Sequence, residues 1–227
     1  MTPWYLHPRW NLAKDSAMHP NPSFRQASPN RSIGFARERG FGTLATNGAD
    51  GPLTAHVPFL LSEDGKRAEL HLMRSNPIAR ASAVPTKAVI TVTGPDSYIS
   101  PDWYHVADQV PTWNYVAIRI TGTLVPLPHD QLHALLDRLS THFETQLLPK
   151  APWHSDKMSD GVMDRMMRQI LPYQFDVSDI DGTWKLGQNK QHDARLSAAD
   201  HVAAYGIGQD TPTLCALMRG ANTEIPE

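Results

Sequence analysis

Four short segments of the chain combine aromatic, amide and cationic or hydroxyl side chains where strands would end. They are LHLMRSNP at 70–77, GPDSYISPDWY at 94–104, VPTWNY at 110–115 and WKLGQNK at 184–190. A phosphate group that carries nearly two negative charges is bound by Arg or Lys, by hydroxyls and by backbone N–H groups. A flat heteroaromatic ring needs an apolar wall and hydrogen-bond partners along its polar edge. These are the side-chain types that a site for flavin mononucleotide (FMN) needs, although each segment alone would also suit a core or a turn.

Other common chemistries lack their sequence signatures. Among eleven histidines, the helix-spaced pair His129 and His133 lacks the glutamate of a zinc-protease motif. The single cysteine, Cys215, cannot form a paired metal motif. Neither a nucleophile elbow nor a glycine-rich nucleotide loop is present in the sequence. We therefore assign no metal site and no catalytic residue.

Composition and charge also limit the function. The 227 residues carry a formal net charge of −2, without the basic excess that drives binding to nucleic-acid phosphates. One cysteine gives no reason for an oxidising compartment. The N-terminus lacks an apolar stretch of signal-peptide length, and no apolar run approaches the ~18 residues of a membrane span. We expect a cytoplasmic protein without a membrane segment.

The first third of the chain predicts a helix followed by a hairpin. Ser28-Pro29 resembles an N-cap with proline at the first helical position, and Gly40 would end the helix after Arg39. The runs Phe41–Thr46 and Leu53–Leu61 read as strands, because apolar residues alternate in the second run.

The rest of the chain predicts a β meander with helices. Further strands are expected at Ala68–Met73, Ala88–Thr93, 113–125 and near Thr183–Leu186, and amphipathic helices within 132–143 and 162–170. Ser197 and Asp200 resemble a capping box before a short helix that ends near Gly206, and Thr211-Pro212 would open a terminal helix. The pattern is typical of a barrel or sandwich.

Several segments resemble the PaiB family of FMN-binding negative transcriptional regulators. They are TWNY at 112–115, YISPDWY at 98–104, WKLGQNK at 184–190, RSNP at 74–77 and the entry WYLHPRW at 4–10. The match runs in order over roughly residues 3–205. The chain departs from the family pattern at Gly187, where serine is usual, and in the short connection 105–109.

The resemblance implies a mainly β fold with α additions: a split β-barrel related to pyridoxamine-phosphate oxidases and flavin reductases, with peripheral helices. We expect about six strands from 41–126 and 172–187, with the helices of 129–171 packed outside. Residues 1–205 would form one FMN-binding domain, and residues 206–227 a C-terminal helical tail. The resemblance also implies a homodimer with two FMN molecules at its interface.

The implied function is that of an FMN-binding regulatory protein, a sensor of redox or flavin status. Two alternatives remain open: an FMN-dependent oxidoreductase that uses the same site, and a haem-handling split barrel in which a histidine ligates iron. DNA binding is implied by the family name alone, since the sequence shows no helix-turn-helix.

The residues predicted to hold FMN come from the matching segments and the first hairpin. Arg74 and Ser75, with Asn76 beside them, are expected to bind the phosphate, and Lys185 is a second cation. The expected ring contacts are Trp103, Trp113, Asn114 and Gln188. Thr46 and His56 lie on the first hairpin and could reach the same cleft.

Overall fold

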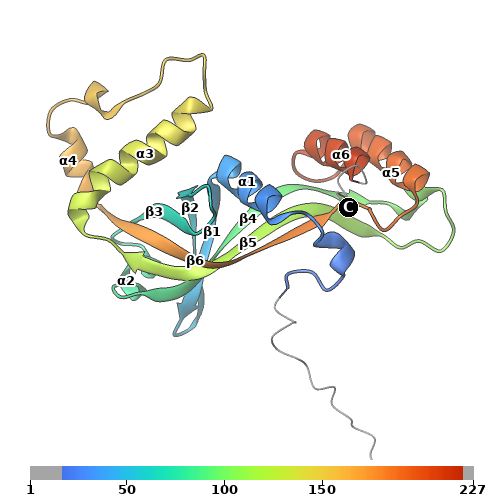
Figure 1. Cartoon of the computed structure of the whole chain (residues 1–227), viewed down its shortest axis with the longest axis horizontal. Coiled ribbons are helices and arrows are strands. Elements are labelled where there is room, and N and C mark those ends of the chain that lie inside the picture. Colours follow the sequence, from blue (N-terminus) through green and yellow to red (C-terminus); the bar gives the residue numbers. More distant parts are fainter. Residues whose placement is uncertain (1–16, 222–227) are drawn as a thin grey trace, which may run out of the picture.

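The computed structural model describes residues 17–221, so the entry segment at 4–10 lies outside the described residues (Figure 1). Six antiparallel strands close into a barrel in the order β1-β2-β3-β6-β5-β4. Their bounds are β1 Phe41–Gly48, β2 Gly51–Leu61, β3 Arg67–Met73, β4 Thr86–Ile99, β5 Thr112–Pro126 and β6 Ile170–Lys185. The split-barrel fold class predicted from the sequence is confirmed.

Alternating side chains explain why these segments close into a barrel. In β1, buried and partly exposed residues alternate from Gly42 to Thr46, as expected for a strand with one face on a core. Side chains from all six strands fill the interior, and the residues Leu44, Phe59, Leu70, Ile90, Ile118 and Phe175 are fully buried. Closure pairs the edge strands of the sheet with each other within the barrel.

Three strands continue beyond the barrel. Strands β4, β5 and β6 have 14, 15 and 16 residues, whereas β1 and β3 have 8 and 7. Figure 1 shows the long strands leaving the barrel to the right and meeting a pair of helices, α5 (His192–Tyr205) and α6 (Thr211–Gly220). We call this part of the molecule the extension.

The remaining helices lie over the barrel. Helix α1 (Pro29–Arg39) crosses the middle of the molecule, and α3 (Leu132–Thr145) and α4 (Val162–Met167) lie over the end opposite the extension (Figure 1). The short α2 (Pro77–Ala81) joins β3 to β4. The predicted ends of α1 are confirmed, because Ser28 Oγ accepts a hydrogen bond from Arg31 N and Gly40 has a φ of 54°.

Three predicted boundaries are wrong. The last strand was expected near Thr183–Leu186, but β6 begins at Ile170, because it pairs with β3 as well as with β5. Strand β4 was expected to end at Thr93, but it continues through an irregularity in its pairing with β5 between Thr93 and Asp96. The predicted capping box at Ser197 lies inside α5, where the backbone oxygen of Ser197 contacts Nδ1 of His201. That spacing is one helical turn rather than a cap.

Helix α6 belongs to the hydrophobic core, because Leu214, Cys215 and Met218 are buried against the extension. The proposed domain boundary at residue 205 stays a prediction. Over residues 17–221, we find no helix with the length and apolar character needed to span a membrane.

Gly122 allows β5 and β6 to pair closely at the register shift beside Thr121. A Cβ atom there would collide with the carbonyl oxygen of Asp176. We expect Gly122→Ala to lower the free energy of unfolding by about 1–3 kcal/mol, the usual cost of overpacking. The matched control is Gly34→Ala on α1, where a Cβ meets nothing within 4 Å. It should raise stability by up to ~1 kcal/mol. Urea unfolding midpoints measure both changes, and equal midpoints would contradict this account of Gly122.

Candidate functional site

The residues predicted to bind FMN lie toward opposite ends of one elongated sheet. At one end Arg74 N donates to Gln169 O over 2.8 Å, just before β6 begins at Ile170. At the other end of β6 lies Lys185. A strand of 16 residues spans up to roughly 50 Å at about 3.3 Å per residue, so one FMN in a single chain cannot contact both cations.

We call Thr46, Arg74, Ser75 and Asn76 the barrel group, and Trp103, Trp113, Asn114, Lys185 and Gln188 the extension group; His56 lies between them.

Arg74 is an anchored but open cation. Its Nε donates to the carbonyl oxygen of Arg168 over 2.6 Å, and the side chain is exposed. Within the described residues its two terminal nitrogens have no hydrogen-bond partner. Burial raises the pKa of the neighbouring Tyr173, and the charge of Arg74 opposes that rise. With exposed Ser75 beside it, this guanidinium suits a phosphate.

Asn76 and Thr46 already serve the fold. Asn76 Oδ1 accepts from Ile78 N over 2.9 Å and caps α2. Thr46 is buried, and its hydroxyl donates to the carbonyl oxygen of Lys87 over 2.9 Å. Their contact with FMN stays a prediction. Because both side chains already make hydrogen bonds within the fold, they would have few free polar groups left for FMN.

His56 lies on the outer face of β2 and is exposed. Its Nδ1 is 3.3 Å from the hydroxyl of Thr43, and its ring meets Phe41 edge-on at 6.3 Å. The register from Thr43 through Thr91 and Arg119 leads to Asp181 on β6, four residues before Lys185.

The two tryptophans of the extension group differ in what covers them. Trp113 is 46% exposed and meets Tyr98 edge-on at 6.2 Å, so it can offer a face to a flat ring. Trp103 is partly buried, and His201 stacks on it at 5.6 Å with an interplanar angle of 11°. Of these two, Trp113 is better suited as a ring wall.

Asn114 and Gln188 are held by the chain itself. Asn114 is buried, and its Nδ2 is 3.6 Å from the sulfur of Met218 on α6. Gln188 folds back onto the end of β6, accepting from Leu186 N and donating to Trp184 O. The turn includes Gly187 at a φ of 78°, a left-handed conformation that glycine adopts at little cost.

Two lysines form a cationic pair at the extension. Lys185 Nζ donates to the hydroxyl of Thr112 over 2.5 Å, and burial, followed by the charge of Lys190, lowers the pKa of Lys185. Lys190 Nζ lies 4.9 Å from the ring centre of Tyr104 and bonds Gln109. Both Lys190 and Gln109 line a hollow of about 220 Å³. The prediction missed Lys190, although it is the last residue of the WKLGQNK segment.

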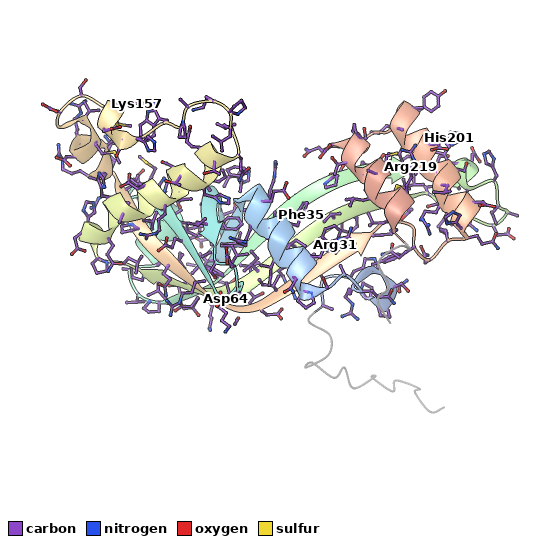
Figure 2. The ribbon with its side chains drawn as sticks, turned by 45° about the horizontal axis from the view of Figure 1, so that its top comes forward. Arg31, Phe35, Asp64, Lys157, His201 and Arg219 are labelled. Carbon is purple, nitrogen blue, oxygen red and sulfur yellow. The ribbon has the colours of Figure 1, made fainter. Side chains whose placement is uncertain are left out.

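A larger cavity lies between α1, the β4 irregularity and α6. Its volume is about 600 Å³, and its walls include Phe35, Trp184 and Leu217. Figure 2 shows Arg31 and Phe35 on α1, between the α3 side of the molecule and the α5–α6 pair. The guanidinium of Arg31 lies 4.1 Å from the ring centre of Trp184. None of the residues predicted to bind FMN lines this cavity.

The donor set fits FMN, but as two half-sites. The barrel group supplies an anchored guanidinium with open nitrogens, and the extension group supplies an exposed tryptophan and two cations. Among residues 17–221, no cluster of three or more His, Cys, Asp or Glu side chains could hold a metal ion.

Comparison with known proteins identifies relatives along most of the chain. The protease synthase and sporulation protein PAI 2 of Bacillus subtilis (strain 168) is 28% identical over 181 residues, which cover 79% of this chain and 86% of that protein. The uncharacterized protein YKL070W of Saccharomyces cerevisiae is 30% identical over 117 residues, covering 47% of this chain and 69% of that protein.

Solved structures share the fold. The FAD and haem binding protein of Mycobacterium smegmatis superposes with a TM-score of 0.52 at 16% identity, covering 80% of each chain. The conserved hypothetical protein Rv2991 of Mycobacterium tuberculosis gives 0.51 at 15% identity, covering 74% of this chain and 92% of that one.

A family model described as "Putative FMN-binding domain" matches residues 18–179. The match extends from before α1 into β6, so it includes the barrel group, while Lys185 and Gln188 lie beyond it. Because it covers most of the chain, and PAI 2 is similar over nearly the same length, the protein belongs to this FMN-binding domain family, as the sequence resemblance predicted.

Proposed function

We propose that the protein is an FMN-binding regulatory protein that works as a homodimer. Each FMN would lie between the barrel group of one chain and the extension group of its partner. The observation that supports this is the separation of two complementary half-sites along one sheet. A two-fold axis that brings unlike ends together creates two equivalent sites.

Each half-site has its own task in this proposal. Arg74 and Ser75 bind the phosphate, while Trp113 forms a wall for the ring and the lysines of the extension face its polar edge or the phosphate. Bound FMN supplies a ring that accepts and releases electrons, which the protein orients. The interface should bury more than about 2,000 Å² in total, because both chains are needed for the site.

The regulatory role is supported by the similarity to PAI 2, which is named for protease synthesis and sporulation. In this role the protein senses redox or flavin status. Its partners are FMN and a second copy of the chain. Direct contact with DNA is not included, because the net charge is −2. A cytoplasmic location completes the proposal, since the lone Cys215 is buried and requires no oxidising compartment.

The surroundings of His56, the histidine among the residues predicted to bind FMN, favour binding over catalysis. General acid–base catalysis needs a proton-transfer group that is tuned and oriented by its neighbours. His56 contacts Thr43 and Phe41, with no carboxylate among its contacts in residues 17–221.

The absorption spectrum of the purified protein, followed by FMN titration and light scattering, tests the proposal. We expect flavin bands, one FMN per chain and a dimer at micromolar concentration. NAD(P)H oxidation should be no faster than with free FMN. A monomer that binds FMN fully would contradict the shared site. A Soret band would favour the haem alternative, and turnover near ~10 s⁻¹, typical of enzymes, would favour the oxidoreductase.

A further inference from the structure

A second system of hollows lies beneath α3, next to the large cavity, with which it shares the lining residue Phe143. Three hollows of about 270, 300 and 330 Å³ share the lining residues Ser140 and Trp153. They lie between α3, the strands beneath it and the segment 146–170 that returns to β6. Figure 1 shows α3 and α4 together over this end of the barrel. No residue predicted to bind FMN lines any of the three.

His71 gives the 270 Å³ hollow a polar group without a partner. Its imidazole lines the hollow, and Nδ1 is shielded and makes no hydrogen bond within residues 17–221. Burial lowers the pKa of His71, so the neutral ring, with one donor and one acceptor, dominates near pH 7. A buried polar atom left unpaired is costly. Because the ring can turn about its Cβ–Cγ bond, either nitrogen can face the hollow.

Most of the other wall residues are apolar and adaptable, although Ser140 and Glu144 also line the 270 Å³ hollow and Asp137 lines the 330 Å³ hollow. Leu136, Leu139 and Phe143 line the hollow with His71. Across Trp153, the neighbouring 330 Å³ hollow is lined by Ile170 and four methionines, Met158, Met163, Met166 and Met167. Methionine side chains adapt to the shape of a ligand and make favourable sulfur–aromatic contacts. Such walls suit a planar aromatic molecule.

Trp153 is held over the hollows by Glu144. The backbone N–H of Trp153 donates to Glu144 Oε2 over 2.8 Å, and Lys150 Nζ binds the same oxygen. This carboxylate therefore fixes the segment that covers α3, so the hollows keep a defined wall.

We propose that these hollows form an effector site for a small planar aromatic molecule that carries one hydroxyl group. The hydroxyl pairs with His71, which it can do as donor or acceptor, and the ring lies against Trp153 and the methionines. The site is also connected to the barrel group. His71 lies on β3, three positions before Arg74, and Arg168, whose carbonyl oxygen holds Arg74 Nε, directly follows Met167. Occupancy therefore changes the affinity of Arg74 for the FMN phosphate, and this coupling rests on the proposed function.

Calorimetric titration with 2-naphthol, using naphthalene as the ligand without the hydroxyl, tests the site in the full-length protein with FMN present. We expect saturable binding of 2-naphthol. His71→Leu should weaken it about three- to tenfold, the effect of one hydrogen bond, without changing naphthalene binding. Trp153→Ala should weaken both ligands. The matched control His105→Leu, at an exposed histidine of the extension, should change neither.

Circular dichroism confirms that each variant is folded before titration. The site is refuted if 2-naphthol does not saturate up to millimolar concentration, or if it binds His71→Leu and Trp153→Ala as it binds the wild type. The coupling is measured separately, as the FMN dissociation constant with and without saturating 2-naphthol, and an unchanged constant refutes it. A protein that binds 2-naphthol but not FMN would refute the proposed function and leave the effector site standing.

Discussion

Arg74→Ala is expected to weaken FMN binding by roughly tenfold to 150-fold, which corresponds to ~1.5–3 kcal/mol. That range is typical of hydrogen bonds to charged groups. The guanidinium is anchored through Nε to the carbonyl oxygen of Arg168, which leaves its terminal nitrogens in place for a phosphate. Because the side chain is exposed, its removal should not disturb the core. Quenching of FMN fluorescence during titration gives the dissociation constant.

The matched control is Arg67→Ala. Arg67 is an exposed arginine at the opposite end of β3, so its removal changes the net charge equally without touching the barrel group. It should leave the FMN dissociation constant within about twofold, because isolated surface charges contribute little. If Arg74→Ala binds FMN as tightly as Arg67→Ala, Arg74 is a solvated turn residue and the phosphate lies elsewhere.

Much of the fold could be predicted because it depends on local patterns. Alternation in Leu53–Leu61 and the caps at Ser28 and Gly40 are set by neighbouring residues, and these elements formed as expected. Strand β4 was predicted too short because Gly94-Pro95 reads as a turn. In the structure these residues lie within the pairing irregularity, where a Cβ on Gly94 would crowd Phe35 and Val116. That packing involves residues far apart in sequence, so no local pattern reveals it.

The candidate site was less predictable than the fold. Residue types pointed to Arg74 and Trp113 together, but their separation depends on how far β4, β5 and β6 continue beyond the barrel. Hydrogen bonding also decides which side chains remain open. Asn76 caps a helix and Gln188 closes a turn, and such uses depend on the backbone conformation around them. The unpartnered imidazole of His71 could not be found from sequence, since α3 covers it from a distant segment.

Mixing two defective variants should restore FMN binding if the site is shared between chains. One variant is Arg74→Ala, which disables the barrel group. The other is the double variant Trp113→Ala/Lys185→Ala, which disables the extension group. In a mixed dimer, one site combines the intact barrel group of the second variant with the intact extension group of the first, while the other site carries both defects. Random pairing makes half of the dimers mixed, so about a quarter of all sites should bind with wild-type affinity.

The experiment refolds the two variants together from urea and measures FMN bound at a concentration that saturates the wild type but neither variant alone. Each variant refolded alone is the control, and light scattering confirms that dimers re-form. A site built within one chain predicts no recovery, because each chain would carry its own defect into every dimer. Recovery near a quarter therefore requires that the barrel group and the extension group meet across the interface, since the length of β6 keeps them apart within one chain.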